Sequence, residues 1–178
     1  MTSPSAHTPD GGVLVGSSGA RRRLVVFEDA QCPFCARFEQ ASGDLLRRET
    51  ASGNVAVEYR MRSFLGPESV RAAAALAAAA EADRFDDLRR LVFQEQPPEH
   101  SGGFTHDDLV ALGARAGITD PAYADAVRTG RYEAWQASLD DALQEQDPDG
   151  TPQALLDGEW VDAEVLYDPE RLGALLRG

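Results

Sequence analysis

Residues 24–35 read LVVFEDAQCPFC, a short apolar run followed by an acidic turn and two cysteines. The run Leu24–Phe27 is apolar and rich in β-branched residues, which is typical of a buried strand. After Cys35 the pattern changes, because apolar residues recur at helical spacing as far as Leu45. Pro33 suits a first helical turn, where its missing N–H costs no hydrogen bond. The sequence therefore predicts that the cysteines lie where a strand ends and a helix begins.

This position favours redox chemistry at the cysteine pair. The N-terminus of a helix carries partial positive charge and free N–H groups, which stabilise a thiolate. Cys32 would lie there and act as the nucleophile. Cys35, one turn further in and more buried, would resolve the mixed disulfide. A structural bridge across so short a loop would add little stability, because the stabilisation grows with loop length.

The cysteine pair has two other interpretations. A lone CxxC can be half of a zinc site, which needs two further ligands. The candidates are His7, His100 and His106, and none of them is close to the pair in the sequence. A purely structural pair is the second alternative. The strand–CxxC–helix context favours redox chemistry over both.

The rest of the chain predicts an α/β fold in a single domain. We expect a disordered tail over residues 1–10 and one domain over residues 11–178, with a helical insertion at about 69–147. Val13–Val15 is expected as a short edge strand, and Val55–Tyr59 alternates like a second buried strand. The phenylalanines expected in the core are Phe27, Phe38, Phe64, Phe85 and Phe93.

A second motif, later in the chain, points to one protein family. Residues 150–158 read GTPQALLDG, a Gly-Thr-Pro followed by a short apolar strand and a tight turn. Together with residues 27–35, FEDAQCPFC, this stretch resembles the DsbA-like thioredoxin family, as do features of the helical region between them. The resemblance covers nearly the whole chain after residue 10. It implies a thioredoxin-like fold with an inserted helical subdomain.

The resemblance also implies roles for individual residues. Pro152 would be cis and would face the cysteine pair, leaving the backbone of Thr151 free to pair with an extended substrate segment. Phe34, at the variable position between the cysteines, would be exposed beside the nucleophile and contact substrate.

The chain departs from the family pattern in two ways. Many relatives carry a buried acid six residues before the nucleophile, where this chain has Val26. Either Glu28 or Asp29 could instead help move the proton of Cys35, although a capping or solvent role is an open alternative. No histidine lies between the cysteines, so we expect the Cys32 pKa to be less depressed than in the strongest oxidants of the family.

The charge and the apolar runs of the chain limit which partners and which cellular compartment we expect. The formal net charge is −13, with 30 acidic residues against 17 basic ones. A chain this acidic repels phosphate backbones, so nucleic acid is not an expected partner. The longest apolar run, Ala72–Ala80, is about half the length of a membrane-spanning helix. We identify neither a membrane span nor a secretion signal, and therefore expect a cytoplasmic protein.

The predicted function is dithiol–disulfide exchange with protein or peptide thiols. It needs no metal or organic cofactor, because the cysteine pair carries the electrons. Its direction depends on the reduction potential and on an unidentified redox partner. The alternatives are a non-catalytic redox-sensing or adaptor domain, and an enzyme of the same superfamily acting on a small thiol such as glutathione.

Overall fold

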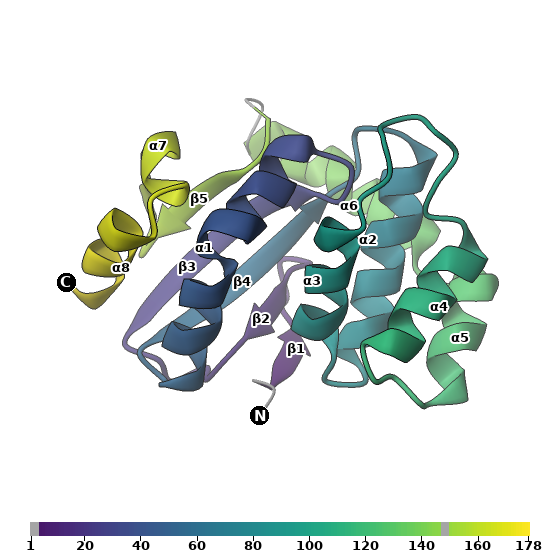
Figure 1. The fold of residues 1–178 in the computed structure, drawn as a ribbon, viewed down its shortest axis with the longest axis horizontal. Helices are drawn as coiled ribbons and strands as arrows, with labels where there is room; N and C mark the ends of the chain where they lie inside the picture. Colours follow the sequence, from purple (N-terminus) through teal and green to yellow (C-terminus); the bar gives the residue numbers. More distant parts are fainter. Residues whose placement is uncertain (1–3, 147–149) are drawn as a thin grey trace.

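The computed structural model describes residues 4–146 and 150–178. Its strands form one mixed sheet in the order β1-β2-β4-β3-β5-β6 (Figure 1). Only the pairing of β3 with β4 is parallel among these strands. The strand bounds are β1 Ser5–His7, β2 Val13–Val15, β3 Arg22–Asp29, β4 Val55–Arg62, β5 Gln153–Leu156 and β6 Glu159–Trp160.

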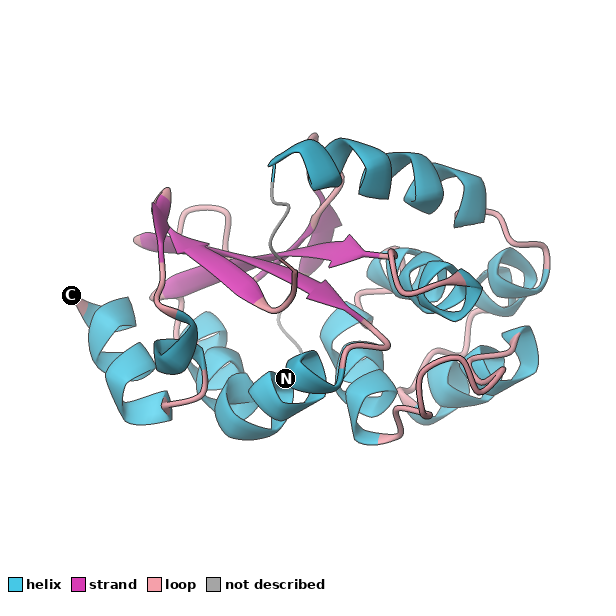
Figure 2. Cartoon of the chain, turned by 90° about the horizontal axis from the view of Figure 1, so that it is seen from above, coloured by secondary structure: helices cyan, strands magenta, loops and turns pink. Residues whose placement is uncertain are grey.

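Helices cover both faces of this sheet. Their bounds are α1 Pro33–Ala51, α2 Pro67–Ala80, α3 Phe85–Gln94, α4 His106–Arg115, α5 Pro121–Arg128, α6 Glu133–Gln146, α7 Ala163–Leu166 and α8 Pro169–Arg177. Figure 2 shows α1 and the C-terminal helices on one side of the sheet, and α6 on the other. The described helices α2 to α6 all fall between β4 and β5, which confirms a thioredoxin-like fold with an inserted helical region.

The parallel pair β3–β4 forms the centre of the sheet. Leu24 lies opposite Val57 and Asp29 lies opposite Arg62, so both strands end at the same edge of the sheet. A parallel pair buried on both faces needs continuous apolar sequence, which explains the run Leu24–Phe27 within β3. Chain segments that follow β3 and β4 therefore meet at this edge.

The alanine-rich helix α2 forms the core of the insertion. Ala72–Ala80 is buried throughout, and α2 packs against α3, α4, α5 and α6. A helix that is apolar all round belongs inside a protein, and its small side chains let several helices approach it closely. Within the described residues, none of the helices combines the length and apolar character needed to cross a membrane.

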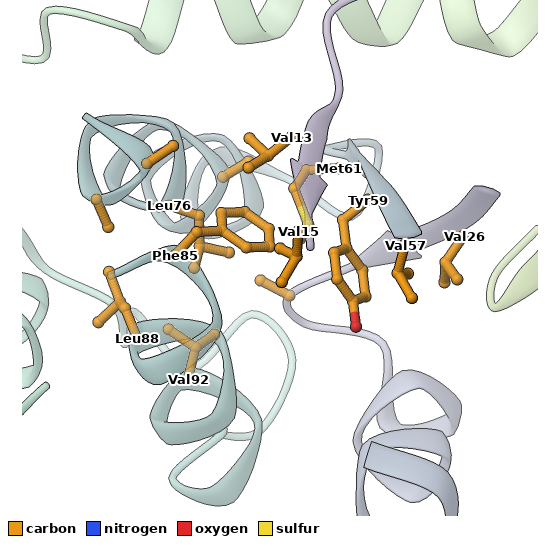
Figure 3. Packing of buried hydrophobic residues seen from close by; sticks show 14 of the residues in the cluster. Val13, Val15, Val26, Val57, Tyr59, Met61, Leu76, Phe85, Leu88 and Val92 are labelled. Atoms are coloured by element: carbon orange, nitrogen blue, oxygen red, sulfur yellow. The ribbon is translucent and has the colours of Figure 1, made fainter. Parts of the chain in front are cut away.

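The main core lies between the sheet and the first helices of the insertion. Figure 3 shows side chains from β2, β4, α2 and α3 meeting around Phe85. Its ring centroid lies 5.4 Å from that of Tyr59. Phe27, Phe38 and Phe93 are also buried, as predicted.

Three expectations were wrong. Ser5–His7 form β1 within the predicted tail, and β1 pairs with β2, so Val13–Val15 is an inner strand and not an edge. Residues 1–3 of that tail lie outside the described residues. Phe64 is 43% exposed, because it follows the end of β4, and the Arg62 guanidinium lies 5.0 Å from its ring centroid. None of these contacts is encoded by a local pattern.

We expect Phe85→Ala to lower the free energy of unfolding by about 3–5 kcal/mol, since it removes a fully buried ring from this core. Urea denaturation measures the loss. The control is Leu175→Ala, which trims a side chain that is 41% exposed and should cost about 0.5 kcal/mol or less. Equal losses for the two variants would contradict this account of the core.

Candidate active site

The cysteine pair lies at the junction of β3 and α1, as the sequence predicts. Cys32 is the N-cap residue of α1, Pro33 begins the helix, and both thiols are free. The backbone N–H groups of Cys35 and Ala36 donate to the Cys32 carbonyl, at 3.0 and 3.2 Å. Cys32 reaches the surface slightly, whereas Cys35 is fully buried. The two thiols therefore occupy different environments.

Residues 150–152, which lie directly before β5, approach the same end of the sheet as the N-terminus of α1 (Figure 1). The Thr151–Pro152 peptide bond is cis, which confirms the expectation for Pro152. The Cys32 Sγ lies 3.4 Å from the Thr151 carbonyl oxygen, to which the thiol form of Cys32 donates. The hydroxyl Oγ1 of Thr151 is buried without a hydrogen-bond partner. The structure thus brings the two motifs into contact, although they are far apart in the sequence.

The environments of the two thiols separate their pKa values. The pKa of Cys32 is lowered to about 6, chiefly by the hydrogen bond from the Cys35 thiol, with help from Thr151 and from the N–H groups of Phe34 and Cys35, and against the effect of burial. This value lies above the pKa of about 3.5 found in the strongest oxidants, in line with the expectation. Burial raises the pKa of Cys35 well above its usual range, and the neighbouring Cys32 adds to the rise. Near neutral pH, Cys32 is the thiolate and Cys35 the thiol.

Asp29 organises the turn before the cysteines. Its carboxylate accepts hydrogen bonds from the Gln31 N–H at 2.9 Å, the Ser69 hydroxyl at 2.6 Å and the Leu65 N–H at 3.3 Å. Burial raises the pKa of Asp29 to about 6, although these hydrogen bonds oppose the rise. The carboxylate therefore links the active-site turn to the segment after β4 and to α2. A solvent role is wrong for Asp29, because the residue is fully buried.

The Glu28 side chain contacts a different residue, Arg89. It is fully buried, and both of its carboxylate oxygens accept hydrogen bonds from Arg89, at 2.5 and 2.7 Å. Burial raises the pKa of Glu28, while the charge of Arg89 opposes the rise. The charge of Glu28 in turn helps to raise the pKa of Cys35. The acid that acts electrostatically on the resolving thiol thus lies four residues before Cys32 in the sequence and not six.

Phe34 is exposed beside the nucleophile, as predicted, with 53% of its surface accessible. The Arg37 guanidinium lies 5.8 Å from the centre of its ring, and the Tyr167 hydroxyl donates to the Phe34 carbonyl at 3.4 Å. The ring therefore offers an apolar surface next to Cys32 and the Thr151 carbonyl.

Sequence reasoning missed residues of the insertion that support the site. Gln96 donates to the carbonyls of Ala30 and Cys32, at 2.8 and 3.0 Å. Phe93 forms a small buried cluster with the two cysteines. Arg89 carries a signal that could have been used, because it lies on the apolar face of α3 with Phe85 and Phe93, where a lone charge indicates a buried ion pair. Gln96 has no comparable signal, since it lies in a loop.

Among the residues that the structure describes, no group of three or more histidine, cysteine or acidic residues is arranged to hold a metal ion. His106, one of the candidate zinc ligands, instead lies with its Nε2 2.6 Å from the Glu133 carboxylate.

A family model described as thioredoxin matches residues 8–176. A comparison with curated proteins found no match.

Several solved structures share the fold. The reduced disulfide bond oxidoreductase DsbG from Mycobacterium tuberculosis superposes with a TM-score of 0.78 at 24% identity, covering 97% of this chain and 85% of its own. MdbA, a thiol-disulfide oxidoreductase from Actinomyces oris, gives 0.81 at 22% identity, covering 97% and 88%. BdbD from Bacillus subtilis gives 0.79 at 20% identity, covering 99% and 97%. The inserted helical region is thus part of a shared architecture.

We expect Cys35→Ala to raise the Cys32 pKa from about 6 toward the ordinary range, because it removes the thiol that donates to the Cys32 thiolate. The ultraviolet absorbance of the thiolate, titrated against pH, measures this shift. Cys35→Ser is the matched control, since its hydroxyl keeps a donor and should shift the pKa less. An unchanged midpoint in Cys35→Ala would show that another group stabilises the thiolate.

Proposed function

This chain belongs to the thioredoxin family, and we propose that it is a dithiol–disulfide oxidoreductase that exchanges its Cys32–Cys35 pair with thiols of proteins or peptides. The observation that carries the proposal is the asymmetry of the two thiols at the Thr151–Pro152 loop. One is a partly accessible thiolate with a pKa of about 6, and the other is a buried thiol.

Exchange with a substrate disulfide takes two steps. The Cys32 thiolate attacks one substrate sulfur, the substrate disulfide breaks, and the other substrate sulfur leaves as a thiolate. Cys35 then loses its proton and attacks Cys32 Sγ, which releases the second substrate thiolate. The pair ends oxidised by two electrons, and the substrate is reduced by two. The reverse sequence transfers the disulfide from the pair to a substrate dithiol.

The groups around the pair suit an extended polypeptide substrate. The backbone of Thr151 lies next to Cys32 and can pair with the main chain of a substrate segment, as in strand addition. Phe34 supplies exposed apolar surface for a substrate side chain. These contacts favour a peptide over a small thiol, which would use neither of them fully.

Of the two acids considered for proton transfer, Glu28 is the better candidate for Cys35. Its charge acts on the Cys35 pKa. Asp29 uses its oxygens to hold the turn in place. We propose Glu28 as the acceptor of the Cys35 proton and Asp29 as the residue that positions the turn.

Trapping of a mixed disulfide between the protein and a substrate tests the proposed function. We expect Cys35→Ser to accumulate a mixed disulfide between Cys32 and a substrate protein, because the resolving thiol is gone, while Cys32→Ser forms none. Non-reducing electrophoresis of the variants mixed with an unfolded, disulfide-containing protein measures the adduct. Adducts with glutathione but not with the protein would support the small-thiol alternative, and the absence of any adduct or of wild-type turnover would support the sensor or adaptor alternative.

The Cys32 pKa also predicts the reduction potential, because a stabilised thiolate favours the reduced form. Thioredoxin has a thiol pKa of about 7 and DsbA of about 3.5. We therefore expect a potential between their values of about −270 and −120 mV. Equilibration with glutathione buffers, followed by trapping of free thiols, measures it. A value outside this interval would contradict the link between the thiolate and the potential.

The cytoplasmic location stays a prediction. It implies that the pair is kept reduced in the cell and works as a reductase or sensor.

A further inference from the structure

The helices α1 and α3 lie side by side (Figure 1), and a groove between them adjoins the cysteine pair. The groove has a volume of about 620 Å³, and all of its lining residues come from these two helices. Ala36 of α1 and Phe93 of α3 line the groove and also pack in the buried cluster of Cys32 and Cys35. The groove thus lies beside the site to which we assign disulfide exchange.

The lining of the groove is positively charged. It contains three arginines, Arg37, Arg47 and Arg90, against two acids, Glu39 and Asp44. Both acids already pair with Arg47, at 2.7 and 2.9 Å. Within the described part of the chain, neither Arg37 nor Arg90 has an acidic group at ion-pair distance. Two cations therefore remain available in a protein whose formal net charge is −13.

Arg37 is held beside the nucleophile by two aromatic rings. Its exposed guanidinium lies 5.8 Å from the ring centroid of Phe34 and 5.5 Å from that of Tyr167. The Tyr167 hydroxyl in turn donates to the Phe34 carbonyl at 3.4 Å. A guanidinium stacked on aromatic faces keeps its N–H edge free for an anion, and its planar fork loses little freedom on binding. Arg37 is thus oriented in advance for a carboxylate.

Arg90 is the second available cation, on the α3 side of the groove. Its Nη1 donates to the side-chain oxygen of Gln94, a neutral group, at 3.4 Å. Arg90 precedes Phe93 by three residues, which is about 4.5 Å along the helix axis. Because Phe93 packs with the cysteines, Arg90 also lies near the part of the groove that adjoins them.

The length of the groove suits a polypeptide segment. Ala36 and Arg47 both line it and lie eleven residues apart on α1, about 16 Å along the helix axis. An extended polypeptide covers this distance with about five residues. A single small anion would fill only part of the groove, whereas a segment with several carboxylates can meet both Arg37 and Arg90.

We propose that the groove between α1 and α3 binds an acidic segment of the polypeptide substrate, and that Arg37 and Arg90 select substrates with Asp or Glu within about five residues of the reactive cysteine. The inference rests on the proposed function and names the substrate class of the same site. Each guanidinium binds a carboxylate through two parallel N–H groups. The negative charge of the rest of the protein repels such a segment, so these arginines direct it to the groove.

Peptides activated as mixed disulfides with a chromogenic aromatic thiol test this selection. Two peptides of equal length carry one cysteine each, flanked by glutamates in one peptide and by glutamines in the other. The Cys32 thiolate bonds to the peptide sulfur, the peptide disulfide breaks, and the aromatic sulfur leaves with the bonding electron pair as a coloured thiolate, because its pKa is the lower. Stopped-flow absorbance gives the second-order rate constant. The reaction of each peptide with a neutral small thiol corrects for its intrinsic reactivity.

We expect the wild-type protein to react about fivefold faster with the glutamate peptide than with the glutamine peptide at low salt. The ratio should fall to about two in Arg37→Gln and to about one when Arg90→Gln is added, while the rate with the glutamine peptide stays the same. High salt should also remove the preference, because it screens exposed charges. The matched control is Arg171→Gln, which removes an exposed arginine of α8 outside the groove and should keep the ratio.

Reversal of the charge separates a direct contact from a structural role. Arg37→Glu should prefer a peptide flanked by lysines over the glutamate peptide, which a merely structural arginine would not produce. If a variant does not fold, the salt dependence of the wild-type ratio decides, since a ratio that high salt leaves unchanged overturns the inference.

The outcomes also separate this inference from the proposed function. A wild-type protein that reacts with neither peptide would overturn both. Equal corrected rates for the two peptides, or a preference for the glutamate peptide that persists in the folded double variant, would overturn the inference alone. Faster reaction with the corresponding mixed disulfide of glutathione than with either peptide would overturn it in favour of a small-thiol substrate.

Discussion

The buried carboxylate of Asp29 is the constraint on which the site depends. It ends β3 and accepts hydrogen bonds from the turn that carries the cysteines, from the segment after β4 and from Ser69 of α2. A buried carboxylate is costly unless such donors satisfy it. Any displacement of the turn would leave these donors and the acid unpaired, so the start of α1 is fixed relative to the sheet and to the insertion.

The insertion consequently contributes residues that contact the active site. Ser69 donates to the Asp29 carboxylate in the turn, Gln96 donates to the carbonyls of Ala30 and Cys32, and Phe93 forms a buried cluster with the cysteines. Each contact brings a residue distant in the sequence against the β3–α1 junction. The thiol chemistry therefore depends on the packing of α2 and α3 as well as on the CPFC motif.

The sequence predicted the features that have a local physical signal. The apolar run of β3, the helical period after Cys35 and the tight turn at Asp157 each follow from their own residues, and the resemblance supplied the cis bond before Pro152. The strand β1, the exposed ring of Phe64 and the contacts of Gln96 depend on partners far along the chain. Periodicity cannot identify such partners, and they were missed for that reason.

The buried ion pairs of Arg89 with Glu28 and Glu39 also explain which residues stand at two positions of the sequence. Arginine and not lysine is needed at position 89, because a planar fork can bind both oxygens of Glu28, reach Glu39 and stack against aromatic faces, whereas an ammonium cannot. Gly43 lies inside α1, where glycine weakens a helix by about 1 kcal/mol relative to alanine. A Cβ there would lie 2.5 Å from the carboxyl carbon of Glu39, which Arg89 and Arg47 hold in place. The helix therefore gives up stability at Gly43 so that the Glu39 carboxylate can pair with Arg89.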